Sequence, residues 1–222
     1  MPALTDLSFD QFVEFHFGQA VRAHGDEWFF DLDGDWWDPE PQVGIAYLTR
    51  LFSNGPEVLE RFSDAQIAQG LDGLINTTGV GDQPWMHSPF VPAAERVSAW
   101  EAVAIFFADV LAPRCSDTLG HLSEPGAPLN NRTYMWWDGF PGFVRPEDPA
   151  QGAIDNAELA CLRSILNLDS AACQEAALHG LGHWVHREPR CEPIIAEYIA
   201  TGRLARPELL NYAKAARTGC IL

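Results

Sequence analysis

The chain has 222 residues, of which 47% are hydrophobic, so it is long and apolar enough to bury the core of one large domain. Its 31 acidic and 14 basic residues give a formal net charge of −17, which argues against a surface that binds nucleic acid or anionic lipid. Residues 1–111 carry most of this charge, with 18 acidic and 4 basic residues and a net of −14. A surface of this kind favours a basic protein as partner.

The cysteines and the N-terminus predict where the protein resides. The five cysteines form no CxxC pair, the first residues show no signal peptide, and no run of apolar residues is long enough to cross a membrane. Thirteen of the 14 basic residues are arginine, as is common in proteins from GC-rich bacteria. We therefore expect a bacterial, cytoplasmic protein with free thiols and no membrane or nucleic-acid partner.

Helix signals dominate the first half. Ser8 and Gln11 have the spacing of a capping box and are followed by an apolar stripe, and Ser63 and Gln66 repeat this pattern. Pro92 suits the first turn of a long helix that runs to about residue 110. Helices are predicted at 43–52, 56–62, 63–75 and 92–110.

Residues 113–153 differ from the rest of the chain. Proline, glycine and asparagine are frequent there, and the stretch 135–142 (MWWDGFPG) has no clear period. A segment of this length is either a disguised pair of helices or a functional loop, and the sequence leaves both open.

Helical periodicity returns after residue 154, and alternating strand patterns are absent throughout. Helices are expected at about 155–167, 170–186, 191–201 and 206–218. The sequence therefore predicts a single all-α domain over 1–222, with an irregular insertion at 113–153. Short connections favour antiparallel helix pairs, arranged as an irregular bundle or as an α-solenoid of the HEAT or armadillo kind.

A resemblance to HEAT repeats lies in residues 154–201. The stretch 176–184 (AALHGLGHW) resembles the inner helix of such a repeat, and Pro189 and the next helix follow at a suitable spacing. On this basis the chain looks like a member of a bacterial family of HEAT-like helical repeat proteins. The resemblance implies a curved scaffold that binds a protein partner, and it implies no catalytic residue.

Four titratable residues fall on one stripe of the predicted helix 170–186. Glu175, His179, His183 and His186 lie within an arc of about 80° on the helical wheel. Histidines at i and i+4, here His179 and His183, can bind one zinc ion, as they do on the helices of zinc proteases. The glutamate that follows the first histidine in those proteases is replaced here by Gly180.

A metal site on this helix needs a further ligand from elsewhere, such as His121, His87 or a carboxylate. Cys173 and Cys191 are less suitable, because Cys173 lies about 120° from His179 on the wheel. The alternative is that the histidines only pack against a neighbouring helix. Glycines at 180 and 182 favour that alternative, because each costs about 1 kcal/mol in a helix and close packing is the simplest compensation.

Two groups of aromatic residues are candidate surfaces for a protein partner. The first accompanies an acidic turn whose spacing departs from a calcium loop, since Trp36 stands where glycine is required and Gln42 where glutamate is. The second lies in the central segment. For both groups the more common role of such residues is to anchor the chain to its core. The candidate partner-binding residues are Trp28, Asp31, Asp33, Asp35, Trp36, Trp37, Trp136 and Trp137.

Together these observations predict a cytoplasmic protein-binding scaffold without catalytic residues or cofactor. One form of it is an acidic immunity or antitoxin-like protein that covers a basic partner. The alternative is a metal-dependent enzyme that uses His179 and His183, with zinc as the cofactor and a third ligand from the central segment.

Overall fold

The computed structural model describes residues 4–31, 34–77, 85–139 and 147–221. Every regular element in these ranges is helical, and one isolated β-bridge joins Leu4 to Trp37. The predicted all-α class is therefore confirmed. None of the described helices combines the length and the apolar character needed to cross a membrane.

The N-terminal helices begin where the sequence signals place them. Ser8 caps the first helix through the predicted capping box with Gln11, and Ser63 and Gln66 exchange the same pair of hydrogen bonds. Pro41 occupies the first turn of the second helix. The elements are α1 (Phe9–Phe17), the 3₁₀ turn η1 (Trp28–Phe30), α2 (Pro41–Ser53), α3 (Gly55–Val58) and α4 (Asp64–Thr77).

The centre of the chain is more helical than its composition indicates. The long helix ends in a π-helical turn, and the irregular segment contains a 3₁₀ turn and two short helices. The described part of 113–153 thus contains a pair of short helices, as the first of the two alternatives expected. The elements are α5 (Ala93–Phe106), η2 (Phe107–Leu111), α6 (Ala112–Arg114), η3 (Gly120–Leu122), α7 (Pro128–Tyr134) and α8 (Trp136–Gly139).

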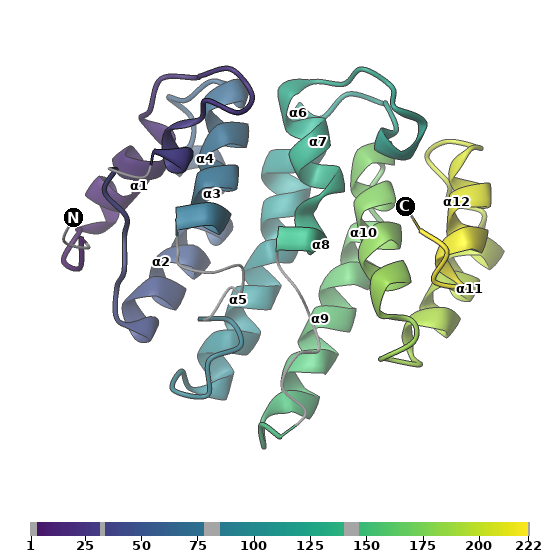
Figure 1. Cartoon of the computed structure of the whole chain (residues 1–222). Coiled ribbons are helices and arrows are strands. Elements are labelled where there is room, and N and C mark those ends of the chain that lie inside the picture. Colours follow the sequence, from purple (N-terminus) through teal and green to yellow (C-terminus); the bar gives the residue numbers. More distant parts are fainter. Residues whose placement is uncertain (1–3, 32–33, 78–84, 140–146, 222) are drawn as a thin grey trace.

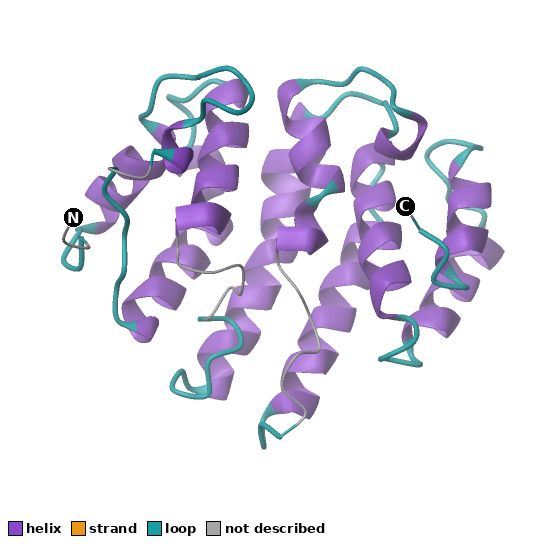
Figure 2. Cartoon of the chain, viewed as in Figure 1, coloured by secondary structure: helices purple, strands orange, loops and turns teal. Residues whose placement is uncertain are grey.

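The C-terminal elements are α9 (Gln151–Leu166), α10 (Ala171–Trp184), α11 (Cys191–Thr201) and α12 (Leu209–Ala216). Helices α1 and α2 lie at one end of the molecule and α11 and α12 at the other (Figure 1). Between these ends, α5 packs against both α2 and α9, and α7 packs against both α4 and α10. Helices make up most of the ribbon, and loops of varied length join them (Figure 2).

Helix α10 lies at the centre of the C-terminal half. It contacts α7, α8, α9, α11 and α12, and nearly all of its side chains are buried. Its N-terminus is fixed by Ser170, whose hydroxyl accepts from the backbone N–H of Cys173. One continuous core of buried apolar side chains extends from α1 to α12. The polar side chains that α10 carries into this core must therefore find partners on the neighbouring elements.

Candidate functional site

The polar stripe predicted on this helix exists over two turns. Glu175, His179 and His183 follow one another at i, i+4 and i+8 on α10 and share one face. His186 does not continue the stripe, because the helix ends at Trp184 and the ring of His186 lies beside Gly219. The stripe therefore contains three of the four titratable residues that the sequence predicted on it.

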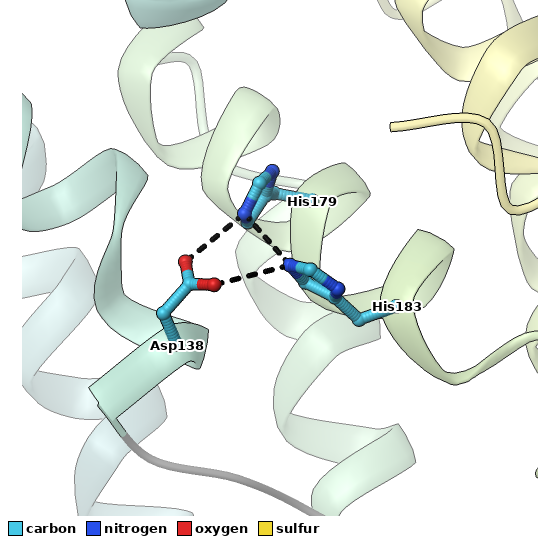
Figure 3. A group of neighbouring side chains, drawn as sticks. All are labelled: Asp138, His179 and His183. Atoms are coloured by element: carbon cyan, nitrogen blue, oxygen red, sulfur yellow. Dashed lines mark hydrogen bonds and ion pairs between the residues drawn. The ribbon is translucent and has the colours of Figure 1, made fainter. Parts of the chain in front are cut away.

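Asp138 joins this stripe from the short helix α8. The three side chains of Asp138, His179 and His183 point toward one another from the two helices (Figure 3). Two indoles hold α8 in place: Trp137 packs edge-on against Trp184, with ring centroids 5.4 Å apart, and lies directly against Gly180. The aspartate therefore reaches the histidines because its neighbour in the chain is anchored on the same helix.

The three side chains meet at hydrogen-bond distance. Nε2 of His179 lies 3.0 Å from Oδ2 of Asp138, and Nε2 of His183 lies 3.2 Å from Oδ1. The two Nε2 atoms are 3.0 Å apart. Hydrogen bonding to His179, and secondly to His183, holds the pKa of Asp138 well below its usual range. The aspartate is therefore a carboxylate at neutral pH.

The group is compact enough for one metal ion, because one ligand atom from each of the three side chains lies within 4.8 Å of the other two. An ion about 2.1 Å from two ligands at right angles separates them by about 3.0 Å, which is the distance between the two Nε2 atoms. Two imidazole nitrogens and one carboxylate oxygen on one face are the ligand set of many mononuclear metal sites that keep positions open. Among the described residues, Asp138, His179 and His183 are the histidine, cysteine or acidic side chains whose ligand atoms lie close enough together to bind one metal ion.

The group is buried on one side and open on the other. The His179 side chain is 3% exposed, whereas those of His183 and Asp138 are 40% and 38% exposed. An ion held here would have protein behind it and solvent in front, so its remaining positions would be accessible to water or to a substrate.

A second layer of polar contacts surrounds His179. Its Nδ1 lies 2.7 Å from the hydroxyl of Tyr212 on α12, and that hydroxyl lies 3.4 Å from the hydroxyl of Tyr134 on α7. Burial raises the pKa of both phenols, so they remain neutral. Metal-binding histidines usually use their second ring nitrogen in this way.

The other predicted ligands lie elsewhere. His121 bonds through Nδ1 to Oε1 of Glu175 at 2.5 Å, and the same carboxylate accepts from the backbone N–H groups of Gly120 and His121. His87 is buried 3.6 Å from Oε1 of Glu158. Neither histidine belongs to the group around Asp138, because each has a buried carboxylate of its own.

The cysteines are also unsuited to the site. Cys173 and Cys191 are buried, and burial raises the pKa of each thiol to about 12. They are therefore protonated at neutral pH, and neither lies in the group. Of the candidate third ligands, the one that the structure brings to the two histidines is a carboxylate, that of Asp138.

Most of the predicted aromatic surface is core. Trp28, Trp37, Trp136 and Trp137 are buried, whereas Trp36 is exposed. Trp37 stacks on Tyr47 with an interplanar angle of 10°, and Trp136 and Trp137 both pack on Phe107. The prediction that these four indoles present a partner-binding surface is corrected, because neighbouring helices cover them.

The acidic part of the first group remains at the surface. Asp31 and Asp35 are exposed, and Asp33 lies outside the described residues. Trp36, beside Asp35, is therefore the one predicted indole that is exposed in the described part of the chain.

Comparison with family models, with curated proteins and with solved structures finds no match to this chain.

Proposed function

We propose that this protein is a metal-dependent enzyme that binds one divalent transition-metal ion through Asp138, His179 and His183. The observation that supports the proposal is the convergence of three ligand atoms, one from each side chain, within 4.8 Å of one another, at a place open to solvent on one side. We therefore prefer the metal-dependent enzyme, which was the alternative in the sequence analysis, to the protein-binding scaffold that the sequence favoured.

The electron pairs of the group support a bound cation. The hydroxyl of Tyr212 lies 2.7 Å from Nδ1 of His179 and can accept a hydrogen bond from that nitrogen when it carries the proton. A neutral His179 with its proton on Nδ1 would present a lone pair at Nε2, which faces the Asp138 carboxylate and Nε2 of His183. A metal ion at the centre satisfies all three donor atoms at once.

The ligand types restrict the metal. Two imidazoles suit zinc, iron, nickel or copper better than the oxygen-preferring magnesium and calcium, and the absence of a thiolate from the three ligands disfavours Cu(I). Three protein ligands leave positions for water and substrate. The ion can then lower the pKa of a bound water or polarise a substrate oxygen. Hydrolysis and oxygenation are the two reaction classes that this ligand set serves.

The metal content of the untagged protein, purified without chelator, tests this proposal. We expect close to one zinc, iron, nickel or copper ion per chain, and loss of that ion in His183→Ala and in Asp138→Asn. His186→Ala is the matched control, because His186 is an exposed histidine of the same segment that does not touch the group. The proposal would be overturned if the wild-type protein bound no metal in buffer supplemented with these ions, or if both ligand variants retained their metal.

A second candidate is the protein-binding scaffold with HEAT-like helix pairs. Its support is the charge of −14 on residues 1–111 together with a groove of about 540 Å³ between α2 and α5, lined among others by Ile45, Ala46, Ala94 and Ser98. Charge complementarity predicts that a basic partner associates more slowly as salt rises. An association rate that does not change with salt would contradict this candidate.

A further inference from the structure

Small side chains line the groove between α2 and α5. The two helices pack against each other, and Ala46, Ala94 and Ser98 leave a hollow of about 540 Å³ between them, which the buried side chain of Ile45 also lines. The three small residues are exposed, so the hollow opens to solvent. A hollow of this size, lined mainly by apolar atoms, lies in the range of binding sites in known proteins.

Exposed apolar side chains gather at both ends of this groove. Phe90 lies at the end where α2 begins, because its carbonyl oxygen accepts a hydrogen bond of 2.9 Å from Nε2 of Gln42. It is 79% exposed, the largest fraction for a large apolar side chain among the described residues, and Val43 is 38% exposed. Ile105 is 40% exposed and follows Ser98 by seven positions, so it continues the groove-facing stripe of α5. Apolar side chains grouped in this way mark an interaction surface.

We infer that this groove is the docking site for one amphipathic helix of a basic protein partner. The apolar stripe of that helix lies between α2 and α5, and its cations lie over acidic side chains beside the groove. The inference extends the second candidate function, since it names the part of the partner that binds and the surface that receives it. It does not depend on the metal site.

The shape of the groove selects a helix over other peptide conformations. Between Val43 and Ser53, α2 advances by about 15 Å, which is the length of about three helical turns. Both walls of the groove are helices, so they offer no strand edge to which an extended peptide could add a strand. Small side chains on both walls let a third helix approach closely, with its ridge of apolar side chains in the groove.

The charges beside the groove are mainly acidic. Glu95 lines the groove, Glu101 lies further along α5, and Glu40 immediately precedes α2; all three are exposed. Arg50 also lines the groove, but its guanidinium stacks on the ring of Phe9, 3.9 Å from the centroid, and is thus directed toward α1. Cations that flank the apolar stripe of a partner helix would therefore meet carboxylates. A second copy of this chain is a poor occupant, because each copy carries a charge of −17.

Synthetic peptides test the inference on the full chain. The probe is a fluorescein-labelled peptide of about 15 residues, long enough to form a helix, with leucines at helical spacing and lysines elsewhere. One comparison peptide carries glutamates in place of the lysines, and another has the composition of the probe in an order without helical spacing. We expect fluorescence anisotropy to show that the probe binds, that its binding weakens as salt rises, and that both comparison peptides bind at least about 5-fold more weakly.

Two variants of the groove should weaken binding of the lysine probe. Phe90→Ala removes the exposed anchor at one end, and Ala46→Tyr fills the hollow; we expect a loss of about 5-fold or more for each. The matched controls are Phe30→Ala, at a phenylalanine of η1 that is 53% exposed, and Ala160→Tyr, at an exposed position of α9. Neither control position lines the groove, and all four substitutions are at exposed positions that the fold should tolerate.

Several results would overturn the inference. They are absence of binding of the lysine probe, equal affinity for the lysine and glutamate peptides, and losses in Phe90→Ala and Ala46→Tyr no greater than in the controls. A dimer in sedimentation equilibrium that Ala46→Tyr dissociates would assign the groove to a second copy of the chain and overturn it as well. His183→Ala, which removes a ligand of the proposed metal site, should bind the probe as tightly as the wild type does. Failure of the metal proposal can thus be told from failure of this one.

Discussion

The indole of Trp137 occupies the place where any residue other than glycine at position 180 would carry its side chain. A Cβ built on Gly180 would lie 2.6 Å from Cγ of Trp137, and Trp137 is itself almost completely buried. The glycine that weakens the middle of α10 is thus the contact that brings α8 and its aspartate against the helix. The close packing expected at positions 180 and 182 is present, since Gly182 meets Ala216 and Ile221 in the same way.

Substitution of Gly180 by alanine is expected to destabilise the protein by about 1–3 kcal/mol, although alanine is the better helix former. The added methyl group must displace Trp137 and with it Asp138, so bound metal should also be lost. Gly152→Ala in α9 is the control, because nothing lies within 4 Å of the added Cβ there. Urea denaturation and metal analysis of both variants provide the test, and a Gly180→Ala protein as stable as wild type would contradict the prediction.

The histidine at position 16 should make the protein sensitive to mild acid. His16 is buried among aromatic rings that include Phe12, Trp28 and Trp37, and burial lowers its pKa from 6.5 to about 4. Between about pH 6.5 and pH 4, His16 is therefore protonated in the unfolded chain but neutral in the folded chain. Stability contributed by the neutral ring is complete above pH 6.5 and is lost as the pH falls toward 4, by up to about 3 kcal/mol.

Replacement of His16 by leucine should remove this dependence. The difference in unfolding free energy between wild type and His16→Leu, measured at about pH 7.5 and again at about pH 4.5, should shift in favour of the variant at the lower pH. His24→Leu removes a fully exposed histidine and serves as the control. A difference that stays constant between the two pH values would show that burial does not suppress protonation of His16.

The ion pair between Arg96 and Asp148 should be costly to break. The two side chains are 2.5 Å apart and both are buried, so Arg96→Met leaves a carboxylate in the core without its cation. We expect a loss of about 3–5 kcal/mol in urea denaturation. The exposed pair of Arg61 and Glu14 offers the comparison, and Arg61→Met should cost less than about 1 kcal/mol. Equal losses in the two variants would contradict the role assigned to burial.

The side chain of Asn130 organises the segment that leads to η3. Its Oδ1 accepts from the backbone N–H of Ser116, and its Nδ2 donates to the carbonyl oxygen of the same residue and to Thr118 Oγ1. Asn130→Asp replaces the donor with an acceptor and should cost about 1–3 kcal/mol in thermal or urea unfolding. Asn167→Asp, at an exposed helix end, should cost clearly less, and the reverse order would argue against this role.

Local signals in the sequence predict the helices well. The capping boxes at Ser8 and Ser63, the first-turn prolines and the helical periods act over a few residues, and they place α1, α4, α9 and α11 to within a few positions. The segment 113–153 resists this reasoning because α7 and α8 are too short to display a period, and their helicity depends on packing against α4 and α10.

The candidate site is only half visible in the sequence. His179 and His183 follow from their spacing, but Asp138 is separated from His179 by 41 positions and belongs to a four-residue helix. Nothing local indicates that these residues meet. The prediction of a partner-binding surface at Trp28 and Trp37 was wrong for a similar reason. Both residues flank an acidic turn in the sequence, yet both indoles are buried in the fold.

The 41 positions between Asp138 and His179 also give the proposed ion a consequence for folding. An ion that joins α8 to α10 closes a loop of the chain and binds only the folded form, so mass action adds its binding energy to the stability of the fold. At free metal concentrations 100 times the dissociation constant this amounts to about 2.7 kcal/mol. The supply of metal would then set how much of the protein stays folded, as well as whether its site is filled.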